Sequence, residues 1–314
     1  MAVDCIGGGC SRWSASDAAV LPSACWRAGQ KRTEPYTVQV ILSTASFQLP
    51  ALWASAPGCA AALAYLHVAA SAQVQGRQPL LLVAWCLHGL ALIAHLSGLA
   101  EAGGGVHFGF AVVLSLTAWL VLAVYTVESR FMPLGSSRRG LAGLGLLTVT
   151  LVLLFPADAR PAGSSSWAPL HWILGIASYA LFGAAVLHAA LLDRSERALR
   201  KRKAGANVDA PMVPLLQLEA LTFRFVAAGF VVLSLALLLG AWFATPWRWD
   251  HKSVFSVLGW LVLGGLLAGR QAFGWRGRRA TRWLYVGSGL LLLAYVGSRF
   301  VLEVLLHRPA GGAA

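Results

Sequence analysis

Apolar runs of about 20 residues recur along the whole chain, and they limit what it can fold into more than any other feature. A helix of about 20 residues crosses a hydrocarbon core of about 30 Å, so each run has the length of one membrane span. The fourth run is short and needs the glycine-rich segment 140–145 to complete it. We therefore predict an all-α, polytopic membrane protein with about eight transmembrane helices, at approximately residues 50–70, 80–99, 107–127, 140–155, 168–192, 222–244, 253–271 and 282–306.

Charged residues are scarce, and their distribution predicts an orientation. Only 12% of the residues are charged and 58% are hydrophobic, whereas about a quarter of a soluble domain is charged, which excludes a soluble enzyme domain. The net charge of +13 is not gathered in one patch, so we expect no nucleic-acid partner. Loops after the odd-numbered predicted helices hold sixteen Lys and Arg residues, and those after the second, fourth and sixth hold three. The positive-inside rule then predicts cytoplasmic basic loops and both termini outside.

Composition divides the chain into three parts. Residues 1–45 are rich in Gly, Ser, Ala and Cys and show no apolar signal-peptide core, so we expect a disordered tail there. The tail is also basic, which fits an outer location poorly and leads to the hypothesis that translation starts downstream, near Val38 or Val40. Residues 46–307 form the predicted membrane domain, and residues 308–314 form a short C-terminal tail.

Motifs of the common catalytic chemistries do not occur in the sequence. The cysteines form no C-x-x-C or C-x-x-C-H pattern, so the chain is neither a thiol oxidoreductase nor itself a c-type cytochrome. The phosphate-loop, G-x-S-x-G and H-E-x-x-H patterns are also missing. We therefore assign no catalytic residue.

Histidine is the residue type that points to a cofactor. Under the predicted topology, five of the eight histidines lie on the outer side: His95, His107, His171, His251 and His307. Imidazole is a good ligand for haem iron, although a histidine at a helix end is commonly only an interfacial polar residue. His88 and His95 are seven residues apart, about 10 Å along a helix, which is too far for both to bind one iron. For His88, near mid-membrane, two interpretations stay open: a ligand, or a histidine hydrogen-bonded to a neighbouring helix.

The last predicted helix ends with a row of polar residues. Arg299, Glu303 and His307 are each four residues apart and so share a helix face. One interpretation is an ion pair between Arg299 and Glu303 that only locks helix packing. The other is that Glu303 orients His307 as a ligand, while Arg299 faces a carboxylate such as a haem propionate.

A tryptophan-containing loop lies on the same predicted side. It could be part of the aromatic belt that anchors helix ends at the lipid headgroups. Alternatively, it could form a shelf for a flat macrocycle, with Arg248 or Lys252 facing the propionates. Its residues are Trp247, Arg248, Trp249, Asp250, His251 and Lys252.

At this loop the sequence resembles a known family. Residues 247–252 and the apolar helix after them are similar to the WWD loop and following helix of the cytochrome c assembly family, the CcsA-type haem-handling membrane proteins. His171, with the Ser-Tyr-Ala-Leu continuation at 178–181, resembles the family's helix-opening histidine, and His307 resembles its terminal histidine. The similarity is most specific over residues 167–307 and is nearest to the shorter YpjD- or HemX-like members. Because the loop has only two Trp and one Asp, the resemblance implies haem binding rather than haem ligation to an apocytochrome.

The resemblance implies a haem-binding protein of the bacterial inner membrane that acts in cytochrome c assembly. The haem, either a b-type group or a transient cargo, would have His171 and His307 as axial ligands. Expected partners are membrane lipid, haem, and cytochrome c assembly or haem-biosynthesis proteins. The other expected contacts with haem are Trp247, Arg248, Trp249, Asp250, His251, Lys252 and Arg299, with His95 as a further candidate.

Two other functions stay open. A HemX-like regulatory or scaffolding protein would bind a cytoplasmic partner through the basic segment Arg194–Lys203. A small-solute transporter has less support, because no acidic residue lies near mid-membrane in the predicted helices.

Overall fold

The computed structural model describes eleven stretches of the chain, which fall into two units, Met1–Ser46 and Phe47–Ala314. In the first unit, β1 (Cys5–Ile6) and β2 (Gly9–Cys10) pair antiparallel. The expected disorder of residues 1–45 falls mainly outside the described residues. These are residues 5–6, 9–10, 49–71, 78–97, 106–107, 109–130, 137–155, 159–160, 167–203, 215–243 and 249–301.

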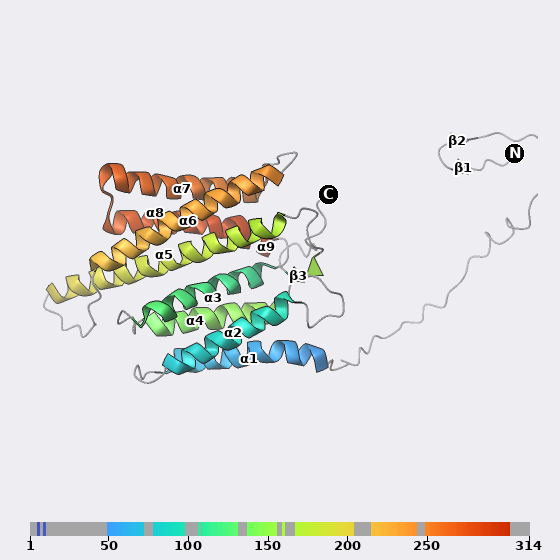
Figure 1. The fold of residues 1–314 in the computed structure, drawn as a ribbon, viewed down its shortest axis with the longest axis horizontal. Coiled ribbons are helices and arrows are strands. Elements are labelled where there is room, and N and C mark those ends of the chain that lie inside the picture. The colour runs from blue at the N-terminus through green and yellow to red at the C-terminus, as the bar shows by residue number, and fades with distance from the viewer. Residues whose placement is uncertain are drawn as a thin grey trace, which may run out of the picture. The chain divides into compact units, whose positions relative to one another are not determined.

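The second unit contains a helix at each predicted apolar run (Figure 1). In the last run, the helix passes through a π-helical turn, η3, in which backbone hydrogen bonds span five residues instead of four. Two short strands also pair antiparallel, β3 (Val106–His107) and β4 (Ala159–Arg160). The helical elements are α1 (Leu49–Ala70), α2 (Gln78–Leu96), α3 (Phe110–Glu128), α4 (Arg138–Leu154), α5 (Ala168–Lys203), α6 (Leu215–Phe243), α7 (His251–Phe273), α8 (Gly277–Leu292), η3 (Leu293–Gly297) and α9 (Ser298–Phe300).

The helices confirm an all-α, multi-pass membrane protein. Within the described residues, five of them, α2, α3, α5, α6 and α7, are long and apolar enough to cross a membrane. A shorter apolar stretch, Ser55–Ala70, lies in α1. The number of eight spans, and the side of the membrane on which each loop lies, stay predictions.

Figure 1 shows helices α1–α4 lying together and helices α5–α8 lying together. Helix α1 packs against α2 and α4, α5 packs against α6 and α8, and α3 joins the groups by packing against α5. Tyr65 and Leu122 are fully buried in the first core, and Phe182 and Leu263 are buried in the second. The first core also includes Leu191 and Leu192 of α5 and Leu218 of α6, so the two groups are packed together.

Small residues let α7 and α8 approach each other closely. A Cβ atom added at Gly287 would lie 2.6 Å from Cγ of Leu263, and one added at Gly259 would lie 3.3 Å from the Gly287 carbonyl oxygen. Close backbone approach through glycine is typical of membrane helix pairs, where packing contacts take over from the hydrophobic effect. The pair forms one wall of the cavity described below.

Candidate functional site

The largest described cavity lies between α5, α6, α7, α8 and the η3 region, and Val113 of α3 also lines it. Its volume is about 250 Å³, whereas the other described gaps measure about 10 Å³ each. Three of the predicted binding residues, His171, Lys252 and Arg299, line this cavity. The sequence separates them by up to 128 positions, and the packing of α5 against α6 and α8 brings them to one site.

His171, near the start of α5, is held by the backbone of α6. Its Nδ1 lies 3.0 Å from the carbonyl oxygen of Ala236. A carbonyl can only accept a hydrogen bond, so Nδ1 carries a proton, and in the neutral imidazole the lone pair is then on Nε2. Metal-binding histidines are commonly held in this way, with the second ring nitrogen donating to a backbone carbonyl. The site therefore presents an oriented imidazole that can act as a ligand.

Gly240 provides the space for this imidazole. A Cβ atom at Gly240 would lie 2.9 Å from Cε1 of His171, closer than real Cβ contacts. Gly240 lies four residues after Ala236, so both face His171 from the same side of α6. The His171 ring thus hydrogen-bonds to α6 at Ala236 and packs against α6 at Gly240.

The cavity combines apolar and aromatic walls with two cations. Trp172 and Tyr295 line it together with aliphatic side chains of α5, α6 and α8. The guanidinium carbon of Arg299 lies 5.9 Å from the centroid of the Tyr295 ring, within the range of a cation–π contact. Lys252, in the first turn of α7, supplies the second positive charge. Such a site suits a flat apolar ligand that carries carboxylates.

Tyr179 fixes α8 against α5 where η3 begins. Its hydroxyl donates a hydrogen bond to the carbonyl oxygen of Leu291, and both residues line the cavity. Two residues later the helical hydrogen bonds change from the α to the π pattern, and Ser298 donates its backbone N–H to the Leu293 carbonyl, five residues back. π-turns are frequent at functional sites. This one carries Tyr295 in its middle and leads directly to Arg299.

Among the described residues of the predicted WWD-like loop, Lys252 lines the cavity and Asp250 has a structural role in α7. Asp250 is the N-cap of α7, because its Oδ1 accepts hydrogen bonds from the backbone N–H of Ser253 at 2.8 Å and from its hydroxyl at 2.7 Å. Partial burial opposes ionisation, but these bonds and the charges of Lys252 and His251 hold the pKa of the Asp250 carboxyl below its ordinary value. Trp249 is 69% exposed and His251 is also exposed.

Several predicted residues lie outside the described part of the chain. Trp247, Arg248, Glu303 and His307 fall there. The second axial ligand, His307, and its support by Glu303 therefore stay predictions.

His88 and His95 belong to a different part of the fold. Nε2 of His88 lies 2.7 Å from Oγ of Ser115 on α3, and its Nδ1 lies 3.2 Å from the Tyr65 hydroxyl on α1. This confirms the interpretation of His88 as a buried histidine hydrogen-bonded to neighbouring helices. His95 lines the same gap of about 10 Å³ as His88, among α1, α2, α3 and α4, and does not line the cavity with His171. His95 therefore lies apart from the cavity that His171 lines.

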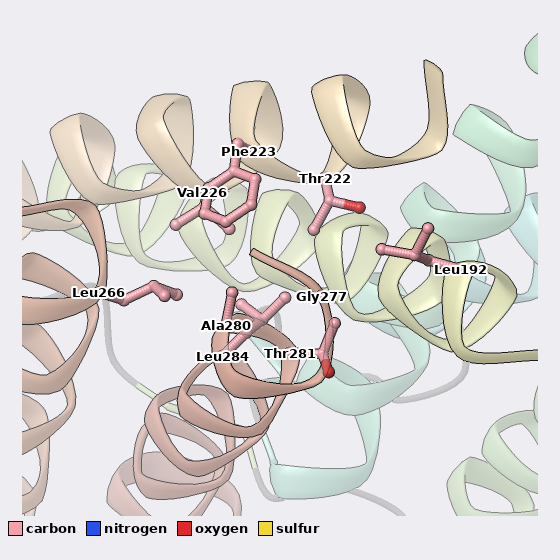
Figure 2. A pocket seen from close by; sticks show the side chains of 9 residues that line it. All are labelled: Leu192, Thr222, Phe223, Val226, Leu266, Gly277, Ala280, Thr281 and Leu284. Carbon is pink, nitrogen blue, oxygen red and sulfur yellow. The ribbon is translucent and has the colours of Figure 1, made fainter. Parts of the chain in front are cut away.

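Another small gap lies between α5, α6, α7 and α8 (Figure 2). Its volume of about 10 Å³ is close to that of one water-sized probe, far too small for a cofactor. Figure 2 shows mostly aliphatic and aromatic side chains around it, with only Thr222 and Thr281 as polar members. Both hydroxyls already donate within the protein, to the Leu218 carbonyl and to Asp193 or Arg278, so the gap is a packing defect.

Sequence reasoning missed the residues that position the site. Ala236, Gly240 and Tyr295 have no pattern that distinguishes them from the rest of their apolar helices. Tyr179 was noticed only as part of the Ser-Tyr-Ala-Leu resemblance. An available signal was the Tyr in that motif, because a buried Tyr hydroxyl needs a hydrogen-bond partner and so indicates a helix contact.

Comparisons with known proteins agree with this architecture. The sequence model of the cytochrome C assembly protein family matches residues 74–306, which include all the described cavity walls. An uncharacterized 28.8 kDa protein of Azospirillum brasilense is 31% identical over 224 residues, 66% of this chain and 80% of that protein. Inner membrane protein YpjD of Escherichia coli is 28% identical over 233 residues, 71% of this chain and 85% of that protein.

A third relative carries a name that refers to biogenesis. Cytochrome c biogenesis protein CcsA of Prochlorococcus marinus is 24% identical over 228 residues, 62% of this chain and 72% of that protein. No solved structure matches the chain. The family match covers well over half of the chain and confirms the resemblance found in the sequence. The chain therefore belongs to the cytochrome c assembly protein family.

Proposed function

We propose that the chain binds haem in the cavity at His171 and holds or presents it during cytochrome c assembly, without catalysing a reaction itself. Family membership and the CcsA relatives support a role in cytochrome c biogenesis. The observation that carries haem binding is the geometry of His171, which lines the cavity and whose Nδ1 is hydrogen-bonded to the Ala236 carbonyl, so that Nε2 has the lone pair in the neutral imidazole.

The residues present fit a haem. Haem iron accepts an imidazole nitrogen as axial ligand, which Nε2 of His171 would supply. Lys252 and Arg299 would face the propionates, and Trp172 and Tyr295 would contact the ring system. The volume of about 250 Å³ is slightly below the 300 Å³ or so at which ligand pockets usually begin. The cavity would therefore hold only part of the macrocycle, as suits a protein that passes on its haem.

The visible spectrum of the purified, full-length protein tests the iron ligand. Addition of haem to the detergent-solubilised protein should give a shifted Soret band in the wild type. His171→Ala should lose or weaken this band, and imidazole added to the buffer should partly restore it. His67→Ala is the matched control, because His67 is exposed on α1 and does not line the cavity. An unchanged spectrum in His171→Ala would show that the ligand lies elsewhere.

A modified haem tests the two cations separately. Lys252→Gln and Arg299→Gln should each weaken haem binding by about tenfold, the typical loss of a charge-assisted contact. The same variants should bind haem dimethyl ester as well as the wild type does, because the ester has no propionate charge. Equal losses for both compounds would place these side chains in a structural role.

The scaffolding function remains a second candidate, supported by one observation. Arg194, Arg197 and Arg200 are exposed at three-residue spacing on the extension of α5. Such a charged face is suited to an acidic partner. Purification without bound haem, together with a stoichiometric cytoplasmic protein that is lost in the triple Gln variant, would favour it over haem handling.

A further inference from the structure

The turn between α7 and α8 presents an unusual group of side chains. Gly274, with φ of 62°, ends α7, and its N–H donates to the Arg270 carbonyl at 3.1 Å. Gly277, with φ of 57°, begins α8, so the chain reverses over three residues between the two helices. Four exposed arginines lie on this turn and the first turns of α8: Arg276, Arg278, Arg279 and Arg282.

Three aromatic rings form a stack beside these arginines. Phe273 and Trp275 have ring centroids 6.3 Å apart, and Trp275 and Trp283 have centroids 6.5 Å apart, with interplanar angles of 25° and 16°. Trp275 packs closely on α7, because a Cβ atom added at Gly269 would lie only 2.5 Å from Cε3 of its ring. The outer members are open, since Phe273 is 77% exposed and Trp283 is 43% exposed.

Cationic and aromatic groups are joined in one surface. The guanidinium carbon of Arg279 lies 4.3 Å from the centroid of the Trp275 ring. A planar guanidinium on an aromatic face keeps its N–H edge available for a second partner. We call the surface formed by Phe273, Trp275, Trp283 and the four exposed arginines the Arg–Trp surface.

Two of the carboxylates near this surface, Glu219 and Asp193, are already engaged. Glu219 lies 3.4 Å from Nε of Arg276 and 3.8 Å from a terminal nitrogen of Arg270. Asp193 accepts hydrogen bonds from Tyr285 at 3.0 Å and Thr281 at 3.3 Å.

Glu196 lies near Gly277, with its Oε1 3.5 Å from the position that a Cβ atom would take there. Among the described residues, Arg278, Arg279 and Arg282 form no ion pair with a carboxylate. Their charges therefore remain available for an external anion.

We infer that the Arg–Trp surface binds the phosphodiester headgroup of an anionic phospholipid. Helix α7 is a candidate membrane span that ends at Phe273, so the surface begins where the apolar segment stops. Aromatic side chains at the end of a span lie at headgroup level, and basic residues beside them attract anionic lipid. All cations of the surface are arginines, whose fork of N–H groups matches phosphate oxygens. An acidic protein segment would need no aromatic stack at the membrane boundary, so lipid is the better match.

Native mass spectrometry of the full-length protein in detergent tests this inference. Phosphatidylglycerol and phosphatidylcholine of identical acyl chains are titrated in parallel, and bound lipid is counted. The wild type should bind phosphatidylglycerol selectively. Arg278→Gln/Arg279→Gln/Arg282→Gln should weaken that binding about tenfold or more, because each arginine near an anionic headgroup adds to the attraction. Binding of phosphatidylcholine should not change.

A matched control separates a local site from general electrostatics. Arg194→Gln/Arg197→Gln/Arg200→Gln removes the same charge from exposed positions on α5 outside the Arg–Trp surface, and should leave lipid selectivity unchanged. Equal loss in both triple variants would overturn the inference. Displacement of the lipid by millimolar inorganic phosphate would also overturn it, because the site would then be one for the free anion.

A second set of variants guards against misfolding of the first. The corresponding three Arg→Lys substitutions keep the charge and the topology signal but remove the planar fork, so they should still weaken phosphatidylglycerol binding several-fold. Trp283→Leu should weaken it as well, by removing one end of the stack. Wild-type binding of phosphatidylglycerol by both the triple Arg→Lys variant and Trp283→Leu would refute the assignment. Preferential binding of an acidic peptide over the lipid would refute it as well.

Discussion

Gly240→Ala is the substitution that tests the positioning of His171 most directly. The new Cβ would lie 2.9 Å from Cε1 of His171, whereas ordinary contacts begin near 3.4 Å. The ring must therefore move away from α6 by about 0.5 Å. Because the Ala236 carbonyl lies on the same side of α6, this movement lengthens the Nδ1 to oxygen distance from 3.0 Å towards 3.5 Å, where the hydrogen bond is nearly lost.

The expected loss follows from the role of such hydrogen bonds. Removing the partner that orients a ligating histidine typically costs about 10- to 100-fold in affinity for the metal. This corresponds to about 1.4–2.8 kcal/mol of binding free energy. Titration of haem into the detergent-solubilised protein, followed at the Soret band, measures the change. We expect a weaker complex with the same protein yield.

Gly265→Ala is the matched control for this experiment. A Cβ atom there would meet nothing within 4 Å, so haem affinity should stay at the wild-type value. Gly240→Ala with unchanged affinity would refute the reasoning, because it would show that the imidazole is not held against α6. Equal losses in both variants would point to a general effect of changing a helix glycine.

Four further predictions concern stability and topology. Asp250→Ala should destabilise the protein by about 1 kcal/mol through loss of the α7 N-cap, as measured by SDS-induced unfolding. Asp250→Asn should largely keep the wild-type stability, because Asn is also a good N-cap residue. Folding lowers the pKa of the Asp250 carboxyl, so its ionised form stabilises the folded protein above the ordinary pKa of 3.8. This stabilisation is lost as the pH falls through the lowered pKa. Wild type and Asp250→Asn with the same dependence of stability on acid pH would contradict this. Gly287→Ala should cost about 1–3 kcal/mol by forcing α7 and α8 apart, while Gly289→Ala, which meets nothing within 4 Å, should cost nothing in the same assay. A cysteine introduced at Ser253 should be labelled from outside the cell, and one introduced at Ala204 should be labelled only from inside. The reverse pattern would refute the predicted topology and the outer location of the cavity.

The sequence predicted the positions of the helices well and their ends less well. Hydropathy marks only the part of a helix that lies in lipid, so α6 begins at Leu215 rather than near 222, through a segment that includes Glu219. Likewise, α5 extends past the predicted end at 192 to Lys203, through the basic segment Arg194–Lys203. The η3 turn gave no signal, because a π-turn depends on contacts made by neighbouring helices, here the bond from Tyr179.

Part of the residue set around the candidate cavity was predictable, but its geometry was not. His171, Lys252 and Arg299 were predicted, and packing brings them to one cavity. The WWD-like loop was expected to supply the platform, whereas Asp250 is bonded within its own helix turn and Trp249 is exposed. Hydropathy and charge patterns cannot show whether a polar side chain bonds to its own helix or faces a cavity, because this depends on the local backbone geometry.

The π-turn η3 has a consequence for helical phase. In an uninterrupted α-helix each residue turns by about 100°, so Arg299, eight positions after Leu291, would lie about 80° away from it, and Ser298 would lie within about 20°. One additional residue in the turn cancels one step of rotation, which returns Arg299 to the side of Leu291 and leaves Ser298 bonding to the Leu293 and Ala294 carbonyls of its own helix. A helical wheel drawn at constant pitch would therefore assign serine instead of arginine to the cavity. The single π-turn η3 therefore determines that Arg299, and not Ser298, lines the cavity.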